Sequence, residues 1–208
     1  MTKSSPKTNY HHGDLKRALL DETARVIREE GEDALSLRRL AANLGVSRTA
    51  PYNHFKNKEA LLSAVAEEGF ARFRLALDQG RASRRDEGGR AQTLAHIKAY
   101  IEFAHDNSEY YDLMFGSKPW RSGAPSKSLA ATARAVLRHD VERLMHAQER
   151  GRINANLDVL RFVEVYWGAL HGISRLLLDG VYTGSEPVAR LCEAAADMLW
   201  QQLDPGSE

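Results

Sequence analysis

The sequence contains a single cysteine and no long apolar run. Cys192 is the only thiol among 208 residues, so the chain cannot form an internal disulfide. No apolar stretch approaches the roughly 18 residues that a membrane-spanning helix needs. The N-terminus also lacks the apolar segment of a signal peptide. We therefore expect a soluble, cytoplasmic protein with no membrane partner.

The common catalytic motifs are absent as well. There is no glycine-rich phosphate loop, no His-Glu-x-x-His zinc motif and no Gly-x-Ser-x-Gly nucleophile elbow. His139 and His146 would share a helix face, but a zinc site needs more ligands at short spacing. These absences predict no metal ion, no cofactor and no enzymatic activity. A helical enzyme stays an alternative that turnover of a substrate would reveal.

Charge is distributed unevenly along the chain, although the formal net charge is only +1. Residues 1–58 carry 11 basic and 7 acidic side chains, whereas the remainder carries 18 basic and 21 acidic ones. A basic end on a near-neutral chain is typical of proteins that bind nucleic acids. The alternative is a chance fluctuation in surface charge.

The pattern of apolar residues predicts an all-α fold, since no alternating run of strand length is present. Residues 1–11 are interpreted as a flexible basic arm, and residues 81–90 and 116–126 as loops. Helices are predicted over residues 14–30, 58–80, 91–106, 109–115, 127–150, 157–179 and 186–203, with two short helices after Ser36 and Ser47. We expect a DNA-binding domain with three helices and a helix-turn-helix over residues 1–57. A helical bundle for ligand binding and dimerisation is expected over residues 58–208.

The segment Ser36–Phe55 carries the pattern of a helix-turn-helix. Two short helices meet at the turn Leu44-Gly45-Val46-Ser47, in which Gly45 stands where a left-handed residue is needed. Apolar side chains of the first short helix would hold it against the preceding helix. The second short helix would then project its N-terminal residues toward the major groove of DNA.

These residues resemble the signature of TetR-type regulators. The resemblance is carried by Leu40-Ala41, Gly45-Val46-Ser47, Tyr52, His54-Phe55, Lys58 and Leu61-Leu62. Downstream, Trp167-Gly168-Ala169-Leu170-His171-Gly172 resembles the C-terminal signature of the WHG-type subclass. The family implies an all-α homodimer that a ligand releases from a DNA operator. Pro51 departs from the family pattern, which usually has an apolar residue such as leucine before the tyrosine, and it would change how the recognition helix begins.

Nine residues are candidate contacts to double-stranded DNA. They are Ser36, Arg38, Ser47, Arg48, Thr49, Tyr52, Asn53, His54 and Lys58. Arginine can recognise guanine and asparagine can recognise adenine, so Arg48 and Asn53 are candidates for base recognition. Lys58, at the start of a helix, is a candidate phosphate contact, and His54 is alternatively a packing residue.

The body has a set of aromatic and polar residues that could border a sensor pocket for a small, apolar effector. They are Tyr100, Phe103, Tyr110, Tyr111, Met114, Phe115, Trp167 and His171. The alternative is an ordinary packed core, in which case the body would serve for dimerisation alone. Pairing through the last two helices is expected because they are apolar on more than one face, with Leu177 and Leu199 in the seam.

Overall fold

A computed structural model describes residues 12–116, 120, 125–182 and 188–207. The predicted basic arm, residues 1–11, lies outside the described residues, as does most of the predicted loop at residues 116–126. Within the described residues the chain forms eight α-helices and two short 3₁₀ helices, and it has no strand. In chain order they are α1 (His12–Glu30), η1 (Glu32–Ala34), α2 (Leu37–Asn43), η2 (Ala50–Asn53), α3 (Lys58–Ala82), α4 (Gly89–Asp106), α5 (Ser108–Phe115), α7 (Lys127–Glu149), α8 (Val159–Leu178) and α9 (Val188–Leu203). The predicted all-α fold is confirmed.

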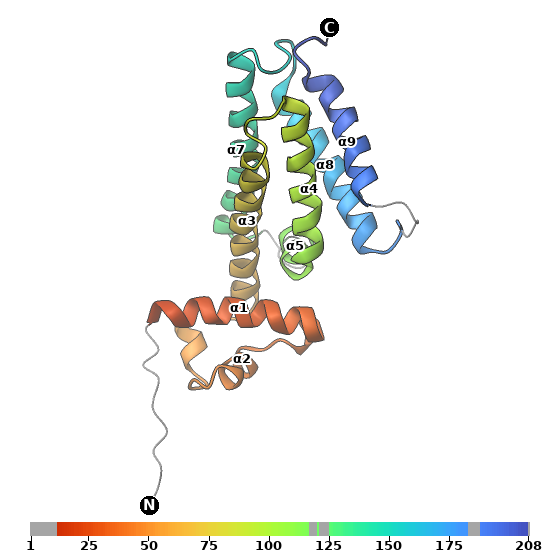
Figure 1. Ribbon diagram of the computed structural model, residues 1–208. Helices are drawn as coiled ribbons and strands as arrows, with labels where there is room; N and C mark the ends of the chain where they lie inside the picture. Colours follow the sequence, from red (N-terminus) through yellow and green to blue (C-terminus); the bar gives the residue numbers. More distant parts are fainter. Residues whose placement is uncertain (1–11, 117–119, 121–124, 183–187, 208) are drawn as a thin grey trace, which may run out of the picture.

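A small head is formed by α1, η1, α2 and η2 (Figure 1). Helix α1 lies across the end of α3, and α2 packs beneath it. Leu19, Val26 and Leu40 are fully buried where these helices meet. The predicted cap of α2 is confirmed, because the Ser36 hydroxyl accepts a hydrogen bond from the Arg39 amide at 3.2 Å.

Helix α3 connects the head to the body. It begins at the cap residue Asn57, whose side-chain oxygen accepts a hydrogen bond from the Ala60 amide at 2.9 Å. Helix α3 contacts α1 near its start and α4, α5 and α7 farther along. It ends at Ala82, beyond the predicted end at residue 80, and α4 begins at Gly89, so the connecting loop is shorter than predicted. The division of the chain at residue 57 stays a prediction, because α3 packs on both parts.

The body is a bundle in which α3, α4, α7, α8 and α9 run side by side, with α5 at the end nearer the head (Figure 1). Helix α4 contacts α3, α8 and α9, so it occupies the middle of the bundle. Phe70, Phe73 and Leu77 of α3 are buried against this centre. The loop between α3 and α4, the end of α7 and the end of α9 meet at the far end of the bundle, away from the head.

Candidate nucleic-acid interface and body cavity

The turn of the helix-turn-helix is built around Gly45. Its backbone is left-handed, with a φ of 65°, a conformation that disfavours a side chain. The amide of Gly45 donates to the carbonyl of Ala42 at 3.2 Å, and the amide of Val46 donates to the carbonyl of Ala41 at 3.0 Å. These bonds satisfy the last carbonyls of α2 and turn the chain toward η2.

The second short helix of the motif is a 3₁₀ helix, Ala50–Asn53, where the sequence predicted a short α-helix. The amide of Ala50 donates to Ser47 at 3.0 Å and the amide of Tyr52 donates to Thr49 at 3.1 Å, which is the tighter 3₁₀ pattern. Pro51 contributes to this difference because it has no amide hydrogen to donate.

The predicted cap of this helix is wrong. The residue before η2 is Thr49, and no side chain caps the helix there. The hydroxyl of Ser47 lies instead 3.3 Å from the hydroxyl of Thr49. The helix starts later than predicted, at Ala50, so Ser47 stands too far from its first amides.

The candidate DNA contacts gather on α2, η2 and the residues that flank them. Seven of the nine are exposed: Ser36, Arg38, Ser47, Arg48, Thr49, Tyr52 and Asn53. Helices α2 and η2 contact each other, so these side chains come from neighbouring elements. Pro51 and Phe55 are buried and anchor η2 to the head. The arrangement exposes arginine, asparagine and tyrosine side chains to a ligand outside the head, while the exposed hydroxyl groups of Ser36, Ser47 and Thr49 already take part in local hydrogen bonds.

His54 and Lys58 are partly buried and have packing environments of their own. The Lys58 ammonium donates to the carbonyl of Glu32 at 2.7 Å. His54 Nε2 is buried and has no hydrogen-bond partner within the described chain. A DNA contact from Lys58 would therefore share the ammonium with η1. Lys56, an exposed cation beside these residues, was not predicted as a DNA contact, because its only sequence signal is its charge.

The candidate sensor residues of the body form a packed aromatic cluster around Phe73. The ring centroid of Phe73 lies 4.9 Å from that of Tyr100, 5.2 Å from that of Phe103 and 6.0 Å from that of Trp167. Tyr100, Tyr111 and Met114 are fully buried. Such distances and tilted ring planes are those of a close-packed aromatic core.

The same cluster includes polar contacts from its tyrosines and His171. The Tyr111 hydroxyl lies 2.8 Å from Nδ1 of His171 and 3.3 Å from the Tyr100 hydroxyl. Burial lowers the pKa of His171, and the charge of nearby Arg175 lowers it further. Burial also raises the pKa of Tyr111 to about 12, so both groups are neutral at neutral pH.

A buried carboxylate, Asp140 of α7, joins this cluster to the far end of the bundle. It accepts a hydrogen bond from Trp167 Nε1 at 3.1 Å and another from the Tyr166 hydroxyl, and it forms an ion pair with Arg81 at 3.3 Å. Burial raises the pKa of Asp140, but the nearby positive charges and the Tyr166 hydrogen bond outweigh it and hold the pKa at about 2. Asp140 was not predicted from the sequence, because an acid on an amphipathic helix looks like part of a solvated face.

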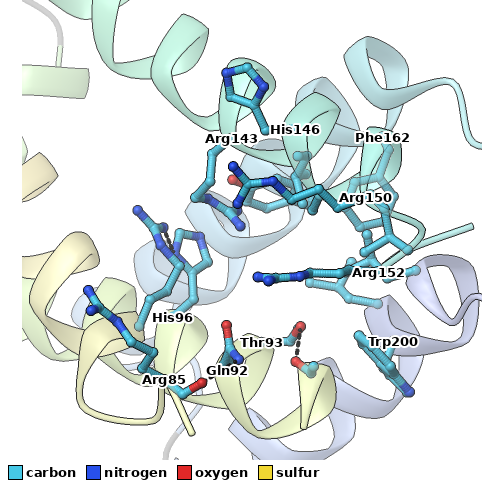
Figure 2. A pocket seen from close by; sticks show the side chains of 18 of the residues that line it. Arg85, Gln92, Thr93, His96, Arg143, His146, Arg150, Arg152, Phe162 and Trp200 are labelled. Carbon is cyan, nitrogen blue, oxygen red and sulfur yellow. Dashed lines mark hydrogen bonds between the residues drawn. The ribbon is translucent and has the colours of Figure 1, made fainter. Parts of the chain in front are cut away.

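A cavity of about 1070 Å³ lies at the far end of the body, beyond Asp140 (Figure 2). It is formed by the end of α3, the start of α4, the end of α7, the start of α8 and the end of α9. Its wall combines arginine and histidine side chains with apolar ones such as Phe162 and Trp200. Because Arg150 and Arg152 are exposed, the cavity is accessible from solvent on that side.

None of the eight predicted ligand-binding residues lines this cavity. The structure brings Tyr100, Phe103, Tyr111, Phe115, Trp167 and His171 together in the aromatic cluster, with Tyr110 and Met114 buried on the neighbouring face of α5. Their ligand-binding role stays a prediction. The cavity residues carried no recognisable motif, because they come from the ends of five different helices.

Helices α8 and α9 both leave apolar side chains on the surface. Val165 is 70% exposed and Met198 is 55% exposed. The expected seam residue Leu199 is misplaced, because it is only 8% exposed and borders the cavity of its own subunit. Leu177 is partly buried. A β-carbon placed at Gly168 or Gly172 would meet no atom within 4 Å, so this face of α8 is open.

The described helices include none that is both long and apolar enough to cross a bilayer. Among the described residues, no group of three or more histidine, cysteine, aspartate or glutamate side chains could hold a metal ion.

Comparison with known families gives matches to both parts of the chain. Residues 19–65 match the family described as "Bacterial regulatory proteins, tetR family". Residues 93–199, just over half of the chain, match "Tetracyclin repressor-like, C-terminal domain". The first match contains the helix-turn-helix. The second contains most of the aromatic cluster and the part of the cavity wall that comes from α7, α8 and the residues between them.

Individual relatives agree with these matches. The chain is 46% identical over 67 residues to the tetracycline repressor protein class A from transposon 1721 of Escherichia coli. The matched segment covers 32% of this chain and 26% of the repressor. A protein of unknown function from Rhodococcus sp. RHA1 is 34% identical, with a TM-score of 0.82 over 95% of this chain and 99% of its own. A TetR-family transcriptional regulator from Rhodococcus sp. has the same fold, with 22% identity and a TM-score of 0.71 over 88% of this chain and 97% of its own. The chain spans about a quarter to a half of the length of the first curated relatives it matches.

Proposed function

Because the chain belongs to the TetR family of bacterial transcriptional regulators, we propose that it is a homodimeric repressor that a small molecule releases from a palindromic operator. DNA binding and transcription regulation are properties of the family. The dimer interface, the operator contacts and the response to a ligand are what we propose for this chain.

The observation that carries the proposal is the exposed polar surface of the head. Arg48, Thr49 and Asn53 are exposed on and beside η2, while Pro51 is buried beneath them. Arg48 has no ion-pair partner within the described part of the chain, and its guanidinium suits the guanine edge in the major groove. The Asn53 amide likewise suits the adenine edge.

The exposed apolar faces of α8 and α9 support dimerisation. Val165 on α8 is 70% exposed and Met198 on α9 is 55% exposed. Exposed apolar side chains on these two helices are unfavourable in water and would be covered by a second copy. Gly168 and Gly172 would let the partner helix approach closely. A two-fold dimer would present two heads to successive major grooves, which favours a palindromic operator.

A ligand would act by favouring a dimer in which the two heads no longer match the operator. It can shift the population only by its difference in affinity for the two states. The cavity of about 1070 Å³ supports ligand control over the alternative of a DNA-binding protein without a ligand, because a body used for dimerisation alone needs no such space.

The proposal is tested by selecting duplexes from a random library with the purified protein. We expect a palindromic site and a dimer bound to it. Arg48→Ala should reduce affinity for the selected site by about 1–3 kcal/mol and have less effect on random DNA. Arg138→Ala, an exposed arginine of α7, is the matched control. Failure to select any site, or equal losses on both DNAs, would contradict the proposal.

A further inference from the structure

We propose that the cavity at the far end of the body binds an amphiphilic anion, a molecule with a carboxylate or phosphate head group and an apolar chain. This inference rests on the proposed function, because it names the chemical class of the effector. It places the effector site beyond Asp140 and away from the aromatic cluster of the body.

The charged part of the cavity wall has an excess of arginine. Its charged residues are five arginines, Arg81, Arg85, Arg143, Arg150 and Arg152, and three acids, Asp78, Glu87 and Glu142. Five positive against three negative charges leave an excess of two. Glu87 is neutralised by Arg84, which lies outside the wall, at 2.6 Å, and Asp78 pairs with Arg81. Asp140, behind the wall, pairs with Arg81 and Arg143, so the excess positive charge that faces a ligand comes mainly from Arg150 and Arg152. The wall is therefore electropositive toward a ligand.

Three of these arginines are available to a ligand. Figure 2 shows Arg143, Arg150 and Arg152 extending into the space between the helices. Arg150 and Arg152 have no ion-pair partner within the described part of the chain, and Arg143 has only Asp140, at 3.6 Å. Carboxylates and phosphates are the groups that guanidinium binds best, through pairs of charge-assisted hydrogen bonds.

His96 adds a neutral hydrogen-bond donor to the same wall. It is 5% exposed, and its Nδ1 lies 2.6 Å from a guanidinium nitrogen of Arg81. Because arginine only donates, Nδ1 must accept, and the neutral ring carries its hydrogen on Nε2. That buried Nε2–H has no acceptor among the described residues, so it would donate to an anionic head group that entered beside it.

The opposite part of the wall is apolar. It includes Ile153, Phe162, Leu199, Trp200 and Leu203. The indole of Trp200 covers the backbone of Gly89 so closely that a β-carbon at residue 89 would lie 2.1 Å from the ring. Ligand pockets commonly measure about 300–1,000 Å³, so this cavity has room for a head group and a chain together.

The two halves of the wall together define the ligand. An uncharged lipophile would cover the arginines without pairing them, which is costly for buried charges. Inorganic phosphate alone would leave the apolar half in contact with water. Only a molecule that carries both chemistries satisfies both surfaces.

The first experiment compares four probes by calorimetry and tryptophan fluorescence, below their micelle concentrations. They are dodecanoate, dodecyl phosphate, dodecanol and dodecyltrimethylammonium. We expect the two anions to bind about tenfold or more tightly than the alcohol, and the cation to bind weakest. Comparison of the two anions distinguishes a carboxylate from a phosphate site. Equal affinity for all four probes would overturn the proposal.

The second experiment places the ligand in the cavity. The double variant Arg150→Ala/Arg152→Ala removes two exposed guanidiniums that make no ion pair in the described structure, so its fold should be kept. We expect it to bind dodecanoate about tenfold or more weakly, and Arg138→Ala to bind it like the wild type. Trp200→Phe should abolish the probe-induced change in fluorescence while binding persists in the calorimeter. Unchanged affinity in the double variant would overturn the proposal.

Operator binding, measured separately, distinguishes this inference from the proposed function. If the anions bind through Arg150 and Arg152 without releasing the selected DNA, the ligand class holds and the effector role fails. If the selected DNA is bound but released only by molecules of another class, the proposed function holds and this inference fails.

Discussion

Glu109, buried at the start of α5, forms an ion pair with Arg28 of α1, so a carboxylate of the body is held by a cation of the head. The Glu109 side chain is 2% exposed, whereas that of Arg28 is 58% exposed. The hydrogen bond from Arg28 to Glu109 raises the pKa of Arg28. The second carboxylate oxygen of Glu109 is buried without a partner in the described chain. The pair therefore ties the orientation of the head to the body.

Replacing Arg28 by alanine leaves the buried Glu109 carboxylate without its cation. We expect a loss of about 1–3 kcal/mol in the free energy of unfolding, measured in urea, because solvent screening at Arg28 reduces the value expected for a fully buried pair. Arg25→Ala is the control, since within the described part of the chain Arg25 pairs with Glu22 and Glu29 of its own helix and with no residue of the body. Adding Glu109→Gln to Arg28→Ala should recover part of the loss. A control that costs as much as Arg28→Ala would show that the effect comes from α1 alone.

Lys58→Ala tests whether this lysine contacts phosphate. If it does, affinity should fall by a similar factor on all DNA sequences and the salt dependence should lose about one unit of slope. Lys127→Ala, an exposed lysine of α7, should change neither quantity. An unchanged salt dependence together with a lower free energy of unfolding would show that Lys58 stabilises the head through its hydrogen bond with Glu32 and does not contact phosphate.

The head was largely predictable because its signals are local. Ser36 caps α2 and Gly45 turns the chain, and each acts on residues within a few positions of itself. The 3₁₀ geometry of η2 was not predicted in detail, because it depends on how Pro51 and Phe55 pack into the head.

The helices of the body were also predictable, but the arrangement of its polar residues was not. Asp140 has its partners Arg81 and Trp167 on α3 and α8, which no local pattern connects to α7. The cavity was not predictable for the same reason, since the ends of five different helices contribute to its wall. The loop between α3 and α4 is shorter than predicted, because α3 continues to Ala82 and α4 already begins at Gly89, whose backbone lies against the distant Trp200.

Val165→Asp should disrupt the dimer. An aspartate on the exposed face of α8 would be buried without a partner in the two-fold seam, which is strongly unfavourable. Light scattering should show a monomer, and affinity for the selected operator should fall. Leu75→Asp is the matched control, because Leu75 is 57% exposed on α3, away from α8 and α9. A variant that remains dimeric would place the interface elsewhere.

His96 predicts a dependence of stability on pH. Burial lowers the pKa of His96 from 6.5 to about 3. As the pH falls below 6.5 the unfolded chain takes up a proton that the folded chain does not, so stability is complete above pH 6.5 and is lost progressively toward pH 3. We expect a loss of about 2 kcal/mol between pH 6.5 and 5. Asp140 affects the pH dependence only at lower pH. Because its folded pKa of about 2 lies below its ordinary value of 3.8, the stability it provides is lost as the pH falls from about 3.8 to 2.

Urea unfolding of His96→Gln should show a flatter dependence on pH over this window, whatever its stability at pH 7. His105→Gln, which removes a histidine with an 81% exposed side chain, should keep the wild-type slope. The same slope in all three proteins would mean that His96 titrates normally in the folded state.

The single variants Phe73→Ala and Trp200→Ala, compared by their free energies of unfolding, test where the body has open space. Phe73 is fully buried, and its ring meets those of Tyr100, Phe103 and Trp167. Its removal leaves a hole that packed neighbours cannot fill, so the free energy of unfolding should fall by about 3–5 kcal/mol. Trp200 is half-buried beside the cavity: its ring packs over Gly89, and the rest of the side chain borders the open space. Its removal should therefore cost clearly less, about 1–2 kcal/mol. Comparable costs measured in urea would indicate that the aromatic cluster is as loosely packed as the cavity. That result would favour the aromatic cluster, with the predicted sensor residues, as the ligand site.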